Sequence, residues 1–366
     1  MKIAILTQPL RANYGGVLQN YALQQVLIKL GHKPITIEKD YLQKINILKF
    51  VYELPKRIYT KYILKKRKYI LNERHNDYIE EFRKILKPFV KTYINHKYVK
   101  DFDLINKSKF NAIIVGSDQV WRPNYNRGYI DKMYLSFIPK NAKIKRIAYA
   151  ASFGTCDWEY DINLTEECSE LVQRFDAVSI REIYGVDLCH KYLGYKDAVS
   201  VLDPTLLLDK TNYIELCKNI NHNEDNILFA YILDKDQETV SSLENIAKQN
   251  NLILKLVTAH EDCSLSMEEW LAMFRDAKMV ITDSFHGTVF SIIFNREFYS
   301  ICNELRGNSR FLSLLSQFNL LDRLSNDIYS INLESKQIDW SSIENKKSIL
   351  QNNSIKFLTD NLNNNA

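Results

Sequence analysis

The sequence predicts an α/β protein of two domains, each a series of strands that alternate with helices. Its 366 residues suffice for two domains with sizeable cores. Short apolar stretches, partly β-branched, alternate along most of the chain with segments of helical periodicity. Hydrophobic residues make up 46% and charged residues 25%, which is ordinary for a globular protein. Such alternation is typical of parallel sheets covered by helices.

The first elements are predicted to form a βαβ unit. Residues 2–7 are expected to be a strand, residues 17–30 a helix, and residues 33–38 a second strand. Gly15 and Gly16 lie at the first strand-to-helix turn. Their pattern is not G-x-G-x-x-G, so a dinucleotide fingerprint is absent. A tight turn without a binding role is the alternative to a ligand-binding loop.

Residues 41–100 interrupt the alternation and are predicted to be an insertion of basic amphipathic helices. From Lys44 to Arg74 ten basic residues stand against two acidic ones, interleaved with Ile, Leu and Tyr. Two interpretations stay open. One is a solvated helical face with an apolar stripe on the core, and the other is a surface for anionic lipid or nucleic acid. Lipid is favoured because no nucleic-acid-binding motif accompanies the charges.

Four further strands in the first half each end in polar residues or glycine. The strands are residues 111–115, 145–151, 176–180 and 198–202, followed by Gly116-Ser117-Asp118, Ser152-Phe153-Gly154, Arg181-Glu182 and Asp203-Pro204-Thr205. In open α/β sheets ligands bind at the carboxyl ends of the strands. We therefore expect these side chains to converge on one cleft.

The domain boundary is predicted at Asp203-Pro204. Residues 1–204 would form an N-terminal Rossmann-like domain that carries the insertion at about 41–100. Residues 205–350 would form a C-terminal Rossmann-like domain. Residues 351–366 are rich in Asn and are predicted to be a tail that frays.

The second half contains the strand–turn–helix on which the functional prediction is centred. Residues 279–282 are predicted to be a buried strand, and a helix is predicted from Phe285, so that His286 and Gly287 fall in or beside its first turn. A helix N-terminus carries unpaired N–H groups and the positive end of the dipole, and so suits an anion. Gly287 would let a ligand approach the backbone. The alternative is a His that merely packs at a turn.

Composition also excludes several classes of protein. The six cysteines lie far apart and include no C-x-x-C pair, which argues against zinc ribbons and redox motifs and for reduced thiols in the cytoplasm. The N-terminal apolar stretch is too short for a signal peptide, and no run approaches the length of a membrane span. If the protein works at a membrane, we expect it at the inner surface, as a peripheral protein.

An ordered set of motifs resembles the polysaccharide pyruvyl transferase family. The motifs are Asn13-Tyr14-Gly15-Gly16, Val115-Gly116-Ser117-Asp118-Gln119-Val120-Trp121, Val178-Ser179-Ile180-Arg181-Glu182, Asp203-Pro204-Thr205, Thr282-Asp283-Ser284-Phe285-His286-Gly287 and residues 310–323. Together they span nearly the whole chain in the expected order. The resemblance implies the GT-B architecture, in which two Rossmann-like domains face a central cleft.

The resemblance also implies an activity. It is the transfer of a pyruvyl group from phosphoenolpyruvate to a sugar of a surface polysaccharide or cell-wall glycan precursor, which we expect to be lipid-linked. The product is a pyruvate ketal across two hydroxyls, and inorganic phosphate leaves. This chemistry needs an acid/base near neutral pH and cations for phosphate and carboxylate. No metal or cofactor is expected besides phosphoenolpyruvate as co-substrate.

Site residues are assigned by the same resemblance. The catalytic residues are expected to be His286 and Arg181. Some family members carry an Arg-Leu pair before the His where this chain has Ser284-Phe285, so the donor-binding cation is expected after the last strand. The predicted donor-binding residues are Ser284, Gly287, Thr288, Arg306 and Arg310. The predicted acceptor-binding residues are Asn13, Tyr14, Gly15, Gly16, Ser117, Asp118 and Trp121.

Two other functions stay open at this point. One is a GT-B glycosyltransferase that uses a nucleotide sugar, and the other is a non-catalytic protein that binds polysaccharide or lipid-linked sugar. Fold alone does not separate these alternatives. The pair Arg181 and His286 favours the pyruvyl transferase. The predicted partners are phosphoenolpyruvate, a sugar or lipid-linked oligosaccharide, and an anionic membrane surface, with no nucleic acid.

Overall fold

The computed structural model describes residues 1–11, 13–39, 47–62, 74–222, 224–258, 265–302, 307–331, 333 and 336–363. The N-terminal domain contains the strands β1 (Lys2–Leu6), β2 (Lys33–Lys39), β3 (His96–Val99), β4 (Ala112–Val115), β5 (Lys145–Ala151), β6 (Ala177–Ile180) and β7 (Val199–Ser200). Its helices are α1 (Tyr14–Lys29), α2 (Ile47–Tyr62), α3 (Arg74–Tyr93), α4 (Ile130–Met133), α5 (Ile162–Val172) and α6 (Ile183–Leu193).

The C-terminal domain follows a short 3₁₀ helix, η4 (Pro204–Leu207). Its strands are β8 (Ile227–Ile232), β9 (Ile253–Thr258), β10 (Met279–Thr282), β11 (Glu297–Ile301) and β12 (Leu324–Ser325). Its helices are α7 (Lys210–Leu216), α8 (Gln237–Gln249), α9 (Met267–Asp276), α10 (Phe285–Ile293), α11 (Ser309–Phe318) and α12 (Trp340–Asn363).

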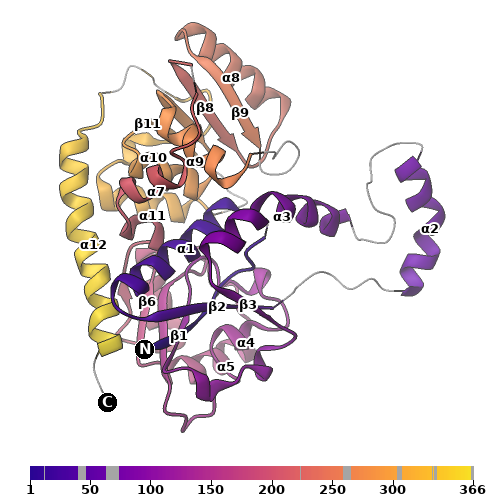
Figure 1. The fold of residues 1–366 in the computed structure, drawn as a ribbon, viewed down its shortest axis with the longest axis vertical. Coiled ribbons are helices and arrows are strands. Elements are labelled where there is room, and N and C mark those ends of the chain that lie inside the picture. Colours follow the sequence, from indigo (N-terminus) through magenta and orange to yellow (C-terminus); the bar gives the residue numbers. More distant parts are fainter. Residues whose placement is uncertain are drawn as a thin grey trace.

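Within the described residues the strands form two sheets, and all pairings are parallel (Figure 1). The first sheet has the order β3-β2-β1-β4-β5-β6-β7 and the second the order β12-β11-β10-β8-β9. Central strands such as β8 are buried along their whole length, because helices cover both faces of a parallel sheet. The prediction of two Rossmann-like domains is therefore confirmed.

The segment 41–100 differs in part from the predicted insertion of basic helices. Helices α2 and α3 do form, but Phe82, Leu86 and Phe89 of α3 are fully buried against the N-terminal domain. Strand β3 then pairs with β2 and extends the sheet. The second half of the predicted insertion is thus part of the domain core, because its apolar residues recur at helical spacing and face α1.

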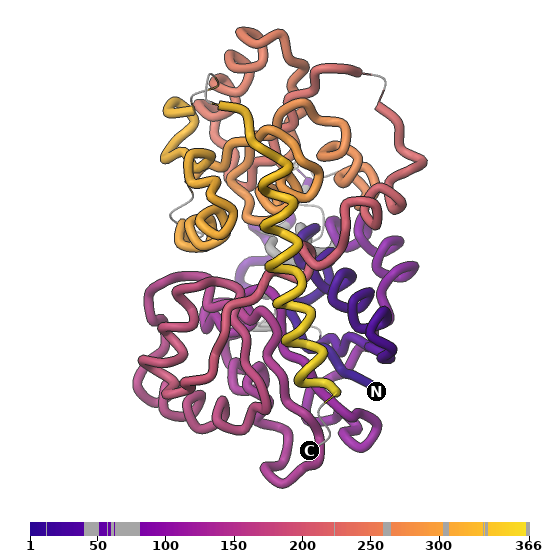
Figure 2. Tube along the Cα trace, turned by 90° about the vertical axis from the view of Figure 1, so that its left-hand side faces the viewer, coloured from indigo at the N-terminus to yellow at the C-terminus, as the bar shows by residue number. Residues whose placement is uncertain are grey.

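The C-terminal residues are helical, so the prediction of a fraying tail from residue 351 is wrong for the described residues up to 363. Helix α12 runs along both domains, and its end lies beside the N-terminal sheet (Figure 2). Leu358 and Leu362 are buried, Ser354 Oγ accepts a hydrogen bond from the backbone N of Leu202, and Lys145 Nζ donates to the carbonyl of Asn361. An apolar stripe with these partners holds the Asn-rich segment in place.

The two domains share an apolar interface. Tyr14, at the start of α1, stacks on Trp270 of α9 with ring centroids 5.0 Å apart, and its hydroxyl donates to the carbonyl of Leu265. Tyr14 also meets Phe82 of α3 edge to face, with centroids 5.0 Å apart. Aromatic contacts of this kind stabilise an arrangement beyond the apolar area they bury. They fix the start of α1 against the C-terminal domain.

No helix among the described residues is long and apolar enough to cross a membrane.

Candidate functional site

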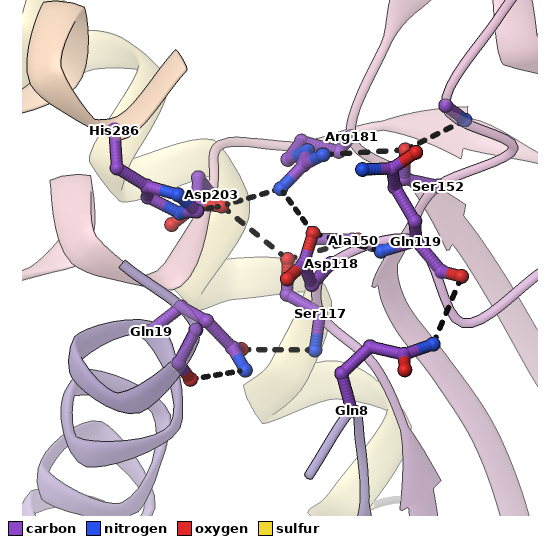
Figure 3. A network of polar contacts seen from close by, with 12 residues as sticks. Gln8, Gln19, Ser117, Asp118, Gln119, Ala150, Ser152, Arg181, Asp203 and His286 are labelled. Atoms are coloured by element: carbon purple, nitrogen blue, oxygen red, sulfur yellow. Dashed lines mark hydrogen bonds and ion pairs between the residues drawn. The ribbon is translucent and has the colours of Figure 1, made fainter. Parts of the chain in front are cut away.

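The site is built where neighbouring strands of the N-terminal sheet end. Ser117 and Asp118 follow β4, Ser152 follows β5, Arg181 follows β6, and Asp203 follows β7. Because these strands are adjacent and parallel, their carboxyl ends meet at one edge, next to the C-terminal domain. The expected convergence of these side chains is therefore observed (Figure 3).

Arg181 is buried among carboxylates, and its side chain is only 2% exposed. Its Nε donates to Glu182 Oε1 at 2.9 Å, one Nη donates to Asp203 Oδ2 at 3.1 Å, and the other donates to Ser152 Oγ at 3.2 Å. Asp118 Oδ1 lies 3.7 Å away. Burial alone would lower the pKa of Arg181, but Glu182, Asp203 and Asp118 raise it. Arg181 is thus a fixed cation that holds three carboxylates together.

Asp203 lies at the centre of the cluster. Its Oδ1 accepts hydrogen bonds from the backbone N and hydroxyl of Thr205, at 3.0 and 2.7 Å. Its Oδ2 faces Arg181, Ser117 Oγ at 3.4 Å, and His286. Burial would raise the pKa of the Asp203 carboxyl, but His286, Arg181 and the backbone N–H of Thr205 hold it well below its usual range. Asp203 is therefore ionised in the folded protein.

His286 reaches this carboxylate from the other domain. It is the second residue of α10, whose N-cap Ser284 accepts a hydrogen bond from Gly287 N at 3.3 Å. His286 Nε2 lies 3.5 Å from Asp203 Oδ2. The nitrogen is buried and makes no hydrogen bond in the described structure. A buried nitrogen that lacks a hydrogen bond and faces a carboxylate is unusual in a packing residue.

Gly15 explains why the imidazole fits at the domain interface. A Cβ placed on Gly15 would overlap the ring of His286 at its Cγ and Nδ1 atoms. The missing side chain therefore makes room for His286, and Nδ1 faces the start of α1. Gly16 differs, because a Cβ there would meet the side chain of Asn13 at an ordinary 3.4 Å.

A small pocket lies beside Asp203 at the junction of the domains. Its lining includes Arg181, Glu182, Asp203, Phe285, Arg310 and Ser313. The ring of Phe285 stands near both guanidinium groups, 4.4 Å from Arg181 Cζ and 5.7 Å from Arg310 Cζ. Burial and then the neighbouring Arg181 charge lower the pKa of Arg310. Arg310 thus brings a second positive charge to the pocket from the C-terminal domain.

The other predicted donor-binding residues have structural partners. Gly287 lets α10 approach β10, since a Cβ there would overlap the Thr282 hydroxyl. The hydroxyl of Thr288 is fully buried and contacts the Ser284 carbonyl and Ser300 Oγ. The prediction that Thr288 faces a ligand is therefore corrected, whereas the approach of a ligand to the backbone of Gly287 stays a prediction. Arg306 lies outside the described residues.

Two of the predicted acceptor-binding residues are core residues. Tyr14 is fully buried in the domain interface. Trp121 is also fully buried, stacks on Tyr134 with ring centroids 4.6 Å apart, and donates from Nε1 to the carbonyl of Met133. Neither ring has surface for a sugar, which corrects the prediction for both. Asn13 is exposed at the start of α1.

Sequence reasoning missed the central residue of the cluster and three of its partners. Asp203 was recognised at a strand end, in a family motif and at the domain boundary but was given no role, although its position after a strand was the same signal that singled out Arg181. Glu182 and Ser152 were recognised at strand ends but given no role. Gln19 carried no signal in the sequence, yet its buried amide accepts from Ser117 N at 3.1 Å and donates to Thr7 Oγ1 at 2.9 Å (Figure 3).

The arrangement combines a His that can exchange a proton with an adjacent ionised carboxylate and two guanidinium groups. Such a set can transfer protons and bind anionic groups at one place. The described residues contain no group of His, Cys, Asp and Glu side chains suited to hold a metal ion.

Comparisons with known proteins agree with this architecture. Residues 13–303 match the family model for polysaccharide pyruvyl transferase. No curated protein sequence matches significantly. Among solved structures, a putative UDP-N-acetylglucosamine 2-epimerase from Listeria monocytogenes is similar at 9% identity and a TM-score of 0.51, over 98% of this chain and 90% of that one.

Two further solved structures are similar. The UDP-GlcNAc 2-epimerase of Methanocaldococcus jannaschii has 11% identity and a TM-score of 0.49, over 96% of this chain and all of that one (100%). UGT89C1 of Arabidopsis thaliana in complex with UDP has 8% identity and a TM-score of 0.48, over 98% and 99% of the two chains. At such identities these likenesses concern the fold alone.

Proposed function

Because this chain belongs to the polysaccharide pyruvyl transferase family, we propose that it transfers a pyruvyl group from phosphoenolpyruvate to a sugar and forms a cyclic ketal. The observation that carries the proposal is the shared Oδ2 of Asp203, which lies 3.1 Å from Arg181 and 3.5 Å from His286. It joins the proton-exchanging His286 to the pocket at the domain junction, which is lined by two guanidinium groups and by carboxylates.

The reaction requires three proton movements. A proton adds to the methylene carbon of phosphoenolpyruvate, and a sugar hydroxyl attacks the resulting cationic carbon and loses its own proton. A second hydroxyl then displaces phosphate, which leaves with its electron pair and takes up the last proton. His286, which faces the ionised carboxylate of Asp203, supplies the proton to carbon. The neutral imidazole then accepts the proton of the attacking hydroxyl.

The donor is held by positive charge from the C-terminal side. Arg310 lines the pocket beside Phe285 and is the proposed partner of the donor's phosphate or carboxylate. Arg181 is fully engaged with Glu182, Asp203 and Asp118, so its role is to hold the carboxylates in place rather than to bind the donor by itself. This changes the role expected for Arg181 from its position after the strand.

The acceptor is proposed to approach from the N-terminal domain. Asn13 is exposed at the start of α1, and Ser117 and Asp118 belong to the polar cluster around Arg181 and Asp203. We propose a lipid-linked precursor of a surface polysaccharide or cell-wall glycan as the acceptor, at the inner face of the cell membrane. No cofactor besides the co-substrate is required by this chemistry.

The test is incubation of the full chain with phosphoenolpyruvate and a panel of lipid-linked oligosaccharides. The expected result is release of inorganic phosphate together with the mass gain of one pyruvyl ketal on one acceptor. A parallel reaction with UDP-sugars should give no product. Transfer of a sugar from a nucleotide donor, with phosphoenolpyruvate untouched, would overturn the proposal.

A further inference from the structure

The positive charge of this protein is concentrated in one segment. Residues 44–74 hold ten basic and two acidic residues, a net charge of +8, whereas the whole chain carries +5. The remaining residues are therefore net acidic. Such a concentration predicts a partner with negative charge for this segment rather than for the protein as a whole.

The helix within this segment also exposes apolar side chains. In α2, apolar residues recur at helical spacing, and several are well exposed: Val51 (62%), Tyr52 (88%), Ile58 (43%), Tyr59 (52%) and Tyr62 (62%). Figure 1 shows α2 standing apart from both domains. Globular proteins rarely expose such an apolar face unless it binds something. A basic helix with an apolar and tyrosine-rich face is typical of helices that lie in a membrane interface.

The next helix leads from this segment to the candidate site. Helix α3 begins at Arg74, and its Phe82, which is 2% exposed, contacts Tyr14 edge to face. Tyr14 precedes Gly15, which lies against His286. Helix α3, which follows α2 in the chain, therefore contacts the junction of the two domains. A membrane bound by α2 would lie on the side of the protein from which α3 leads to that junction.

We propose that α2 docks this protein on an anionic lipid bilayer. The apolar face of α2 would enter the interface, and the net positive charge of the segment would be attracted to the lipid phosphates. A second copy of the chain does not fit, because two segments of +8 would repel each other. The idea that docking presents a lipid-linked acceptor to the site rests on the proposed function. The docking itself does not rest on it.

The experiment is flotation of the full chain with two kinds of vesicle, one of phosphatidylcholine and one of equal parts phosphatidylcholine and phosphatidylglycerol. The protein should float only with the anionic vesicles, and added salt should release it. The double variant Val51→Glu/Ile58→Glu should lose at least about tenfold in binding. The triple variant Lys56→Gln/Arg57→Gln/Lys61→Gln should lose about fivefold per charge removed.

A matched control is Ile162→Glu/Ile349→Glu. Ile162 (77% exposed, at the start of α5) and Ile349 (62% exposed, on α12) are apolar residues outside α2, so their replacement adds the same two negative charges elsewhere. It should bind as the parent protein does, and all variants should keep the parent melting temperature. Flotation needs no substrate, so its failure would leave the proposed chemistry standing. Loss of that chemistry would equally leave the docking intact.

Several outcomes would overturn the docking proposal. They are equal binding to both vesicles, binding to neither, or unchanged binding in the α2 variants. A dimer in sedimentation that the Val51→Glu/Ile58→Glu variant dissociates would assign α2 to a second copy instead. Release from anionic vesicles by duplex DNA at equal phosphate concentration would assign it to nucleic acid.

Discussion

Gly15 of α1 and His286 of α10 belong to different domains, yet the imidazole occupies the space that a side chain at residue 15 would need. The two residues are 271 positions apart in a chain of 366. The contact couples the start of the N-terminal domain to the proton-exchanging residue of the C-terminal one. It also explains why the first of the two early glycines lacks a side chain, because His286 occupies that space.

Gly15→Ala should reduce turnover strongly while the protein still folds. The added methyl group would displace the His286 ring from Asp203, although alanine itself is favoured over glycine in a helix by about 1 kcal/mol. The control is Ile28→Ala, at a position on the same helix that is 51% exposed and lies outside the proposed site. Measurements of turnover and melting temperature for both variants test this expectation. Equal turnover in the two variants would contradict the role assigned to Gly15.

His286→Ala should lower turnover by about 10²–10⁴-fold, the usual contribution of a general acid/base. The fold should persist, because the residue lies at a helix N-terminus and not in the middle of a core. His222 offers a matched control, since its Nδ1 lies 2.8 Å from Asp276 Oδ2 in the same domain, away from the site. His222→Ala should keep full turnover. A fully active His286→Ala protein would reduce His286 to a packing residue.

Asp203→Asn should lower the free energy of unfolding at pH 7 by about 3 kcal/mol, because the buried Arg181 loses a charged partner. The folded-state pKa of Asp203 is depressed, so its ionised form stabilises the fold above the unfolded-state pKa of about 4. That stabilisation is lost as pH falls through the lower folded-state pKa. Melting temperatures of the variant should therefore fall less steeply with acidification below about pH 4.

The control for this pH dependence is Asp157→Asn at an exposed position. It should change neither the free energy of unfolding at pH 7 nor the decrease of the melting temperature below about pH 4. If the melting temperatures of the parent and Asp203→Asn proteins decreased equally with acidification, Asp203 would not be the carboxylate that His286 and Arg181 hold ionised.

Leu358→Ala should destabilise the protein by about 2–5 kcal/mol, since Leu358 is fully buried on α12 against the rest of the chain. Ile349→Ala is the matched control on the same helix, because Ile349 is 62% exposed. Its effect should stay within about 0.5 kcal/mol. Thermal or denaturant unfolding measures the change in the free energy of unfolding for both variants. A neutral Leu358→Ala would support the fraying tail that the Asn-rich composition predicted.

The sequence by itself determined the two-domain α/β architecture, the order of most strands and helices, and the strand-end positions of Arg181 and His286. This information is local. Apolar runs and helical spacing are properties of neighbouring residues, and parallel strands separated by helices follow from their alternation. The capping box of Ser266 and Glu269 at the start of α9 is a further example, because both partners lie within one turn.

Only the tertiary structure decided which of these side chains act together. Asp203 is the common partner of Arg181 and His286 because β7 lies beside β6 and α10 packs across the domain junction. Packing at the domain junction buries Tyr14, and the core of the N-terminal domain buries Trp121, although their motifs pointed to a ligand. Burial and ion pairing depend on elements far apart in the chain that come within a few ångströms only after folding, so no local pattern encodes them.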